Sequence, residues 1–391
     1  MKSFDMYFPV RLLVGAGRVE ELGKWTSDYG KKAFIVYDPF LKGTKLPVTI
    51  KADLAENGVS SIEFFDVVPN PRHTTMDRGV KICLDNECDV VIGVGGGSAI
   101  DSAKAIALAA KHGGSAWDYT ERYFEPENVR RPTTKGLPIL TVPTTAGTGT
   151  EATHVSVVNN HDLRMKCAII NENIYPDVSI IDPELMVTVP KKVSAHTGVD
   201  TFAHAFESYI SKGATEWSRM LAKRSMELFA QSIRAAVNEP KNIDARAQMA
   251  LSCTLAGAAF VQSGLALPHA IGQPVSAITD APHGATLAVC LPVIIKWTIP
   301  EAEADFADVS EILDPSVRDL QQSEKATLLP DILERVYEDI DINETYASYG
   351  MTEEHIKEAV DLSLGAYQWD IGGHPKKVVR ADLEEIYRLC L

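Results

Sequence analysis

The fold class of this chain is decided by the stretch Asp89-Val-Val-Ile-Gly-Val-Gly-Gly-Gly-Ser-Ala-Ile-Asp-Ser-Ala-Lys-Ala-Ile106. Its apolar first half predicts a buried strand, and three glycines lead from that strand directly into a helical pattern starting at Ser98. Glycines let the backbone approach a phosphate closely, and the N-terminus of a helix offers free N–H groups to it. We expect Ser98 to cap this helix. A plain tight turn is the alternative, since the pattern is not the G-x-G-x-x-G fingerprint of an ordinary Rossmann fold.

The residues on either side of this stretch alternate between the two kinds of secondary structure. Strands are predicted at Ala33–Tyr37, Ser61–Phe65, Asp89–Val94 and Pro138–Val142, and helices at Leu46–Asn57, Thr74–Asp85 and Ser98–Lys111. Such alternation predicts a parallel, doubly wound α/β sheet, with Tyr7–Val14 as an outlying strand.

From about Val193 onward the sequence pattern is helical. Long helices are predicted at Thr197–Ser211, Glu216–Val237, Asp244–Gln262, Leu329–Ile340 and Glu353–Tyr367. Pro330 is expected in the first turn of the fourth helix, because proline is tolerated there. We therefore expect an α/β domain over residues 1–187 and an all-α domain over residues 188–391.

Composition excludes several classes of function. A chain of 391 residues predicts two domains, and its net charge of −15 argues against a nucleic acid or an anionic membrane as partner. The first residues lack the apolar run of a secretory signal. The six cysteines form no Cys-x-x-Cys pair, which favours reduced thiols. We expect a cytoplasmic protein that acts on small molecules.

Two further features are expected to contribute to the nucleotide site. The loop Pro143–Glu151 follows a strand and gathers the hydroxyls of Thr144, Thr145 and Thr148, although it could be only a polar loop. Asp38 ends the first strand, where its carboxylate could bind an adenosine ribose and repel a 2′-phosphate. This predicts NAD in preference to NADP. The alternative is that Asp38, which precedes a proline, only starts a turn.

Four residues have the chemistry of metal ligands. Asp200 and His204 are four apart on a predicted helix, so their side chains share one face. His269 and His283 follow in small apolar surroundings. Carboxylate and imidazole together suit Fe(II) or Zn(II), and an open coordination position would take a substrate oxygen. For each histidine alone, a hydrogen-bonded place in the core is the alternative.

With these motifs, the chain resembles the iron-containing (group III) alcohol dehydrogenase family over essentially its full length. The shared elements are Gly95–Ser98 with Asp101 and Lys104, Asn70-Pro71, Pro143–Glu151, Asp182-Pro183-Glu184-Leu185, Gly198–Glu207, His269 and His283-Gly284. The resemblance implies a dinucleotide-binding domain and a helical metal-binding, catalytic domain. It implies one divalent ion, Fe²⁺ before Zn²⁺ or Mn²⁺, held by Asp200, His204, His269 and His283. It also implies an NAD(H) site lined by Asp38, Asn70, Gly96, Gly97, Ser98, Thr144, Thr145, Thr148 and Lys166.

The chain departs from the family pattern at positions near the expected reaction site. Many relatives carry a histidine where this chain has Gln273, which cannot titrate but can hydrogen-bond. Phe260 is a candidate wall of the substrate pocket, with a place in the helix core as the alternative. Thr150 replaces a usual serine. The family's Asn-Pro-Arg reads His374-Pro375-Lys376 here, and Asp370 stands where relatives often have a small pocket-lining residue.

The predicted activity is a metal-dependent, NAD(H)-linked alcohol dehydrogenase or aldehyde reductase acting on a small primary alcohol or aldehyde. Lactaldehyde, diol-derived aldehydes and anionic ones such as sulfoacetaldehyde stay open as substrates. A homodimer or larger homo-oligomer is expected. The alternatives are an enzyme of the dehydroquinate synthase or glycerol-phosphate dehydrogenase type, and a non-catalytic NAD-binding protein.

Overall fold

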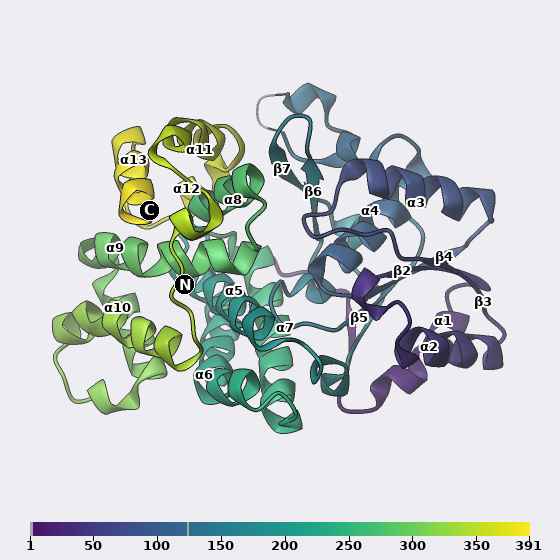
Figure 1. The fold of residues 1–391 in the computed structure, drawn as a ribbon, viewed down its shortest axis with the longest axis horizontal. Helices are drawn as coiled ribbons and strands as arrows, with labels where there is room; N and C mark the ends of the chain where they lie inside the picture. The colour runs from purple at the N-terminus through teal and green to yellow at the C-terminus, as the bar shows by residue number, and fades with distance from the viewer. Residues whose placement is uncertain (1–2, 123–124) are drawn as a thin grey trace. The chain divides into compact units, whose positions relative to one another are not determined.

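The computed structural model describes residues 3–122 and 125–391, which form two compact units (Figure 1). We call residues 7–145 and 149–187 the sheet domain, and residues 188–391 with two short segments the helical domain. Those segments are residues 3–6 and 146–148, which the sequence prediction assigned to the first domain. The second segment is tied to the helical domain by a hydrogen bond from Thr201 Oγ1 to Gly147 O of 3.4 Å.

The sheet domain contains six strands that are all parallel, in the order β1-β8-β5-β4-β2-β3. Their bounds are Arg11–Val14 (β1), Lys32–Tyr37 (β2), Ser60–Phe64 (β3), Val90–Gly95 (β4), Ile139–Pro143 (β5) and Val178–Ile181 (β8). A separate antiparallel hairpin joins Val155–Asn160 (β6) to Met165–Ile170 (β7). The outlying first strand expected from the sequence is β1, at the edge of the sheet.

Both faces of the sheet are covered by helices (Figure 1). Their bounds are Leu22–Ser27 (α1), Lys45–Glu56 (α2), His73–Asp85 (α3) and Gly97–His112 (α4). Along β2, Phe34 packs in one core with residues of α3 and α4, and Ile35 packs in another with residues of α1 and α2. A strand buried on both faces is apolar throughout, as these strands are. The predicted doubly wound fold is confirmed.

The order of the strands places a ligand site at the ends of β2 and β4. From β2 the chain moves outward to β3, then returns to the other side of β2 with β4 and continues outward through β5. The direction of winding therefore reverses between β2 and β4. Open α/β sheets bind ligands beyond the carboxyl ends of the strands at such a reversal. Asp38 follows β2 there, and the glycine turn follows β4.

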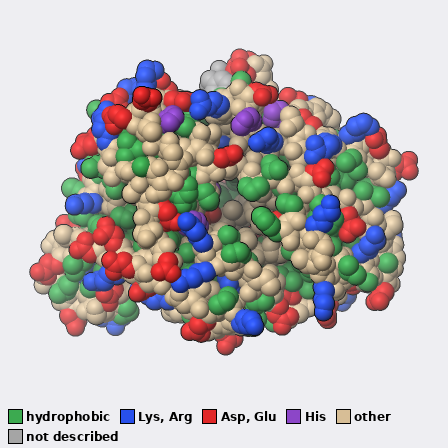
Figure 2. Space-filling model, viewed as in Figure 1, with side chains coloured by type: hydrophobic (Ala, Val, Ile, Leu, Met, Phe, Trp, Pro, Cys, Tyr) green, Lys and Arg blue, Asp and Glu red, His purple; other side chains and the backbone are tan. Residues whose placement is uncertain are grey.

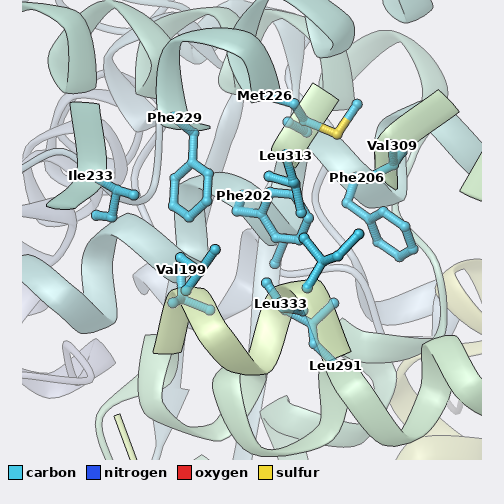
Figure 3. Packing of buried hydrophobic residues seen from close by; sticks show 14 of the residues in the cluster. Val199, Phe202, Phe206, Met226, Phe229, Ile233, Leu291, Val309, Leu313 and Leu333 are labelled. Carbon is cyan, nitrogen blue, oxygen red and sulfur yellow. The ribbon is translucent and has the colours of Figure 1, made fainter. Parts of the chain in front are cut away.

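The described residues of the helical domain form helices and short helical turns without strands. The helices are Lys191–Ile210 (α5), Glu216–Asn238 (α6), Ile243–Ser263 (α7), Leu267–Thr279 (α8), His283–Leu313 (α9), Gln322–Asp339 (α10), Glu353–Ala366 (α11), Gln368–Gly373 (α12) and Arg380–Leu389 (α13). α5 supplies Val199, Phe202 and Phe206 to the main core, where α6, α9 and α10 meet it (Figure 3). Its other side is free to carry polar residues.

The helix α10 starts earlier than the sequence predicted, and α9 is unusually long and apolar. α10 begins at Gln322, so the predicted start at Leu329 is wrong and Pro330 lies inside the helix. Gln321 and Glu324 form a capping box that starts the helix early, which outweighs the hydrogen bond that Pro330 cannot donate. α9 is long and apolar enough for a membrane span, as are α7 and α8 taken together across a bend of 107°. Because 56% of the apolar window of α9 is buried, it resembles a core helix.

The surface carries charges of both signs. Figure 2 shows acidic side chains across the visible face, with Lys and Arg side chains between them. The net charge is −15, so acidic groups outnumber basic ones. Some of the basic groups form ion pairs with neighbouring acids, as Arg234 does with Asp339 and Arg380 with Asp361. All six cysteines are buried, and none of them forms a disulfide within the described residues.

Candidate active site

The glycine turn after β4 is shaped by a close approach of Asp38. Gly95 has a φ of +148°, and a Cβ there would lie 2.6 Å from the Cβ of Asp38. A Cβ on Gly96 would lie 3.2 Å from Thr145 Oγ1 and 3.9 Å from Asp38 Oδ2. The turn thus brings Asp38, Gly95, Gly96 and Thr145 together at the end of the sheet. Only glycine fits at position 95, because the conformation and the space both exclude a side chain.

The helix after the turn starts one residue earlier than predicted. Gly96 is the N-cap and α4 begins at Gly97, so the prediction that Ser98 caps the helix is wrong. Gly97 already has helical geometry, which moves Ser98 into the first turn. The N–H groups of a first turn have no partner within the helix, and the helix dipole makes this end positive. Gly97 and Ser98 can therefore still present N–H groups to a phosphate.

Asp38 combines the two roles considered from the sequence. Its backbone N–H donates to Val94 O at 2.9 Å, which joins the ends of β2 and β4. Its Oδ1 accepts a hydrogen bond from the Phe40 N–H at 3.0 Å, as in a turn starter. Its Oδ2 lies on the side of Gly96. The turn interaction therefore fixes the carboxylate while one oxygen faces the glycine turn.

The Pro143–Glu151 loop is anchored by a buried lysine. Lys104 Nζ donates to Thr150 O at 2.5 Å, Thr153 O at 2.9 Å and Val155 O at 2.9 Å. Thr150 Oγ1 in turn donates to Asp101 Oδ1 at 2.6 Å. Burial lowers the pKa of the Lys104 ammonium to about 8, although Asp101 opposes this. Threonine keeps the hydroxyl that serine would supply here, so this departure from the family pattern preserves the network.

The other predicted nucleotide-site residues fall into separate groups. Thr144 donates its backbone N–H to Gly95 O at 2.9 Å, so it lies beside the glycine turn. Lys166 Nζ donates to Asn70 Oδ1 at 3.2 Å, which brings that predicted pair together. Thr148 belongs to the segment that groups with the helical domain.

The predicted metal ligands converge inside the helical domain. α5 carries Asp200 and His204, while His269 lies in the first turn of α8 and His283 is the first residue of α9. One ligand atom each from Asp200, His269 and His283 lie within 4.8 Å of one another. His204 reaches two of these residues: its Nε2 is 3.1 Å from His269 Nε2, and its Nδ1 is 3.5 Å from Asp200 Oδ1.

The start of α9 is held close to α5 by a glycine. A Cβ on Gly284 would lie 2.2 Å from the carbonyl oxygen of His196, one turn before Asp200. This contact seats the neighbouring His283 with its Nε2 3.6 Å from Asp200 Oδ1. A larger residue at position 284 would push α9 away from α5 and separate the two side chains.

The donor set fits a divalent cation. Among the described residues, Asp200 Oδ1 and His204 Nδ1 are buried and have no hydrogen-bond partner, which is costly unless another ligand satisfies them. Burial lowers the pKa of the His204 imidazole, and this favours the neutral form that binds metals. Two imidazoles on one ion with bonds of about 2.0–2.1 Å stand roughly 3 Å apart. The distance of 3.1 Å between His204 Nε2 and His269 Nε2 agrees with that geometry.

Phe260 and Gln273, predicted beside the reaction site, both lie near these histidines. The Phe260 ring stacks on the His204 ring with centroids 4.8 Å apart. Gln273 stands one helical turn after His269 on α8, and its Oε1 is buried without a hydrogen-bond partner among the described residues. An apolar ring and an unsatisfied amide oxygen thus accompany the ligand cluster.

Sequence reasoning missed Glu207 as a member of the site. Its side chain is fully buried, and its Oε1 lies 2.5 Å from His269 Nδ1. Burial raises the pKa of the Glu207 carboxyl well above its usual range, against the hydrogen bonds from Ala266 and His269. Spacing places residues 200, 204 and 207 on one face of α5, which makes Glu207 a candidate, but spacing alone does not report its contact with His269.

The parallel sheet and the helical domain with its Asp–His cluster agree with the metal-dependent dehydrogenase expected from the sequence. Residues 9–183 match the iron-containing alcohol dehydrogenase family, and residues 194–391 match the Fe-containing alcohol dehydrogenase family, C-terminal. The chain belongs to the iron-containing alcohol dehydrogenase family, as its resemblance implied.

Named relatives support this membership. The chain is 34% identical over 354 residues to the NAD-dependent methanol dehydrogenase of Bacillus methanolicus, covering 90% of this chain and 91% of that one. It is 34% identical over 390 residues to long-chain-alcohol dehydrogenase 1 of Geobacillus thermodenitrificans, covering 99% and 96%. The structure of an archaeal halo-thermophilic alcohol dehydrogenase from a Red Sea brine pool matches with a TM-score of 0.95 at 29% identity, over 100% of both chains.

Proposed function

We propose that this alcohol dehydrogenase interconverts a small primary alcohol and its aldehyde, with NAD(H) as hydride carrier and a divalent metal, iron in this family, at Asp200, His204, His269 and His283. The observation that carries this proposal is the buried cluster of one carboxylate and three imidazoles, with polar atoms left unsatisfied at Asp200 and His204. The relatives' names, a methanol and a long-chain alcohol dehydrogenase, support the same class of reaction.

The metal site is suited to polarising a carbonyl oxygen. When bound, a divalent ion acts as a Lewis acid that stabilises negative charge developing on the substrate oxygen. Asp200 supplies the one negative charge of the ligand set, and the histidines are neutral ligands. The set therefore leaves a net positive site, which such charge stabilisation requires.

The glycine turn and Asp38 are proposed to hold the nucleotide. The first-turn N–H groups of Gly97 and Ser98 suit a pyrophosphate, because the helix N-terminus is positive. The Oδ2 of Asp38 is proposed to accept hydrogen bonds from ribose hydroxyls, and its position beside Gly96 supports this role. Asn70, Thr144, Thr145, Thr148 and Lys166 are proposed to contact the rest of the cofactor.

Phe260 and Gln273 are proposed to position the substrate. The Phe260 ring covers His204 and offers an apolar wall to the substrate carbon chain. Gln273 offers a hydrogen-bonding amide but no exchangeable proton, so it orients the substrate and is not an acid. The apolar ring of Phe260 and the uncharged amide of Gln273 supply no positive charge for an anionic group, so they favour an uncharged substrate over an anionic aldehyde.

An assay of purified protein tests the proposal. The protein is loaded with Fe²⁺ or Zn²⁺ without oxygen, and NADH oxidation is followed with simple aldehydes, lactaldehyde, 3-hydroxypropanal and sulfoacetaldehyde. We expect metal-dependent turnover that is fastest with the uncharged aldehydes. NADH binding without turnover in metal-loaded protein would support a non-catalytic NAD-binding protein instead. A preference for sulfoacetaldehyde would overturn the substrate class alone.

The cellular setting and the oligomeric state are separate proposals. The chain's acidic composition and the dehydrogenase family support a cytoplasmic enzyme that acts as a homo-oligomer. Size-exclusion chromatography with light scattering would test the second point.

A further inference from the structure

Glu207 makes contacts that a buried acid makes when it orients another group. It has no exposed surface, and its Oε2 accepts hydrogen bonds from the Ala266 N–H at 2.8 Å and the His269 N–H at 3.3 Å. Its Oε1 lies 2.5 Å from His269 Nδ1. The same carboxylate therefore holds the first turn of α8 and the imidazole ring that this turn carries.

The two nitrogens of His269 face different partners. Nδ1 faces Glu207, while Nε2 faces His204, whose Nε2 is 3.1 Å away. A neutral imidazole carries its proton on one nitrogen only, and the other then has the lone pair that binds a metal. The N–H donors of Ala266 and His269 at Oε2 favour the carboxylate form of Glu207, and a carboxylate only accepts hydrogen bonds, so it selects the His269 form with the proton on Nδ1. In that form the lone pair that can bind a cation is on Nε2, on the side of His204.

We propose that Glu207 is a positioning residue of the metal centre, which fixes the tautomer and the orientation of His269 so that Nε2 binds the ion. This inference rests on the proposed metal function and adds a residue to it. Histidine ligands commonly donate their other ring N–H to a carboxylate, and losing that partner weakens metal affinity 10- to 100-fold.

The position of Glu207 on α5 explains how one helix performs both tasks. Residues 200, 204 and 207 lie on one face, so the two proposed ligands and the orienting carboxylate move as a unit. The opposite face of α5 is fixed in the core by Val199, Phe202 and Phe206 (Figure 3). A rigid helix thus sets the distance between His204 and the group that orients His269.

The helical domain contains a matched pair that lacks this role. His196 Nε2 lies 3.3 Å from Glu344 Oε1, and Lys192 Nζ lies 2.8 Å from the same oxygen. His196 is as well buried as the ligands but is not among the residues that could hold the metal. Removing the charge of Glu344 therefore tests the general effect of losing a carboxylate beside a histidine.

The experiment compares wild-type protein with Glu207→Gln, Glu207→Asp and the control Glu344→Gln. Each protein is stripped of metal with a chelator and titrated with Co²⁺ without oxygen, while the visible absorption of the bound ion is recorded. Competition with a chelator of known affinity gives the dissociation constant. NADH binding, measured by fluorescence, and thermal unfolding of the stripped protein show whether each variant is folded.

We expect Glu207→Gln to raise the dissociation constant for Co²⁺ 10- to 100-fold and to alter the absorption spectrum, while NADH binding is kept. Glu207→Asp keeps the carboxylate but moves it away from Nδ1, so its dissociation constant for Co²⁺ is expected to lie between those of wild type and Glu207→Gln. Glu344→Gln should bind Co²⁺ like wild type. Wild-type affinity and spectrum in a folded Glu207→Gln protein would overturn the inference, as would equal weakening in Glu344→Gln.

Two further outcomes are informative. If Glu207→Gln does not fold, Glu207→Asp decides, and unchanged Co²⁺ affinity in that variant would overturn the inference. If wild-type protein binds no Co²⁺ at all, the proposed metal function itself is wrong and the inference falls with it. Failure of the inference alone is distinguishable, because wild type then binds the ion and Glu207 variants bind it equally well.

Discussion

The polar cluster around Lys104 in the sheet domain and the cluster around Asp200 in the helical domain are both buried, but their polar atoms are satisfied differently. Lys104 donates to three carbonyl oxygens and to the hydroxyls of Thr150 and Thr153. The two oxygens of Asp101 accept from Thr150 and from the Val157 N–H. Asp200 Oδ1 and His204 Nδ1, by contrast, lack a hydrogen-bond partner among the described residues.

This difference indicates a structural role for the cluster around Lys104 and a ligand-binding role for the cluster around Asp200. A buried ion with all its hydrogen bonds made holds chain segments together, and breaking one side of it is costly to stability. Buried polar atoms without hydrogen bonds destabilise the folded protein, and a bound ligand that contacts them offsets this loss of stability. We therefore expect mutations in the first cluster to lower stability, and mutations in the second to abolish metal binding while the fold survives.

The largest expected effect is that of His269→Ala. This variant loses a proposed metal ligand, so it should lose most of its bound metal. Its kcat/KM should fall at least about 1000-fold, because a bound metal contributes several kcal/mol to stabilising the transition state. Metal analysis of the purified protein and the NADH assay measure both. The control is His112→Ala, a half-buried histidine at the end of α4, which should resemble wild type. Full metal content and wild-type turnover in His269→Ala would show that the ligand assignment is wrong.

Lys104→Met should lower the stability of the protein and leave its metal content unchanged, the reverse of what we expect for His269→Ala. It removes the donor from three buried carbonyls and leaves the charge of Asp101 unpaired, which should lower the free energy of unfolding of the sheet domain by about 3–5 kcal/mol. Chemical denaturation followed by fluorescence measures this change, with the exposed Lys111→Met on the same helix as control. Metal content should stay at the wild-type level. A variant as stable as wild type would mean that this network does not hold the loop.

Asp38→Gly tests the proposed nucleotide site within the sheet domain. The carboxylate should repel the 2′-phosphate of NADP, so its removal should shift the ratio of kcat/KM for the two cofactors toward NADP by about 100-fold, or roughly 2.7 kcal/mol. The control Asp38→Asn keeps a side-chain oxygen for the Phe40 N–H and removes only the charge. If glycine changes the ratio and asparagine does not, turn geometry and not repulsion is responsible.

The sequence predicted those parts of the fold that local signals mark. The strand before Gly95 and the helix after it are recognisable because an apolar run, a glycine turn and a helical period follow one another. β6 and β7 were missed, because the turn of residues 161–164 contains no glycine or proline that would mark a hairpin. α8 and α9 were missed because Pro274, Pro292 and Pro300 interrupt their helical pattern.

The candidate site was predictable to a similar degree. Residue types and spacing indicated Asp200, His204, His269 and His283. Carboxylate and imidazole groups are metal ligands, and the first two residues are four apart on one helix. The role of Glu207 depends on its contact with the first turn of α8, 62 residues later in the chain. No pattern within α5 alone reports a contact of that kind. Tertiary packing decides which acid contacts a proposed ligand and which, like Glu344, contacts a core histidine and a lysine instead.

The smallest expected effect concerns Asp370, whose side chain is half-buried on α12. Burial, and secondarily Glu207, raises the pKa of its carboxyl to about 8. In the unfolded chain the carboxyl titrates near pH 4. Between about pH 4 and pH 8 the folded protein therefore holds one more proton than the unfolded chain, so this group's contribution to stability falls as pH rises and becomes constant above pH 8.

Asp370→Asn should remove that dependence, because an amide is neutral at every pH. In metal-stripped protein we expect the variant and wild type to melt at similar temperatures at pH 5, and the variant to melt about 2–4 °C higher at pH 9, which corresponds to roughly 1 kcal/mol. This is a fraction of the roughly 5 kcal/mol that four pKa units represent, because solvent reaches the half-buried carboxyl and screens its charge. Differential scanning calorimetry across this range measures the change, with Asp361→Asn, an exposed acid on α11, as control. The melting difference should shrink when metal is added, because a cation near the ligand cluster favours the ionised carboxyl. A constant difference from pH 5 to pH 9 would mean that Asp370 is ionised throughout and is only a surface acid.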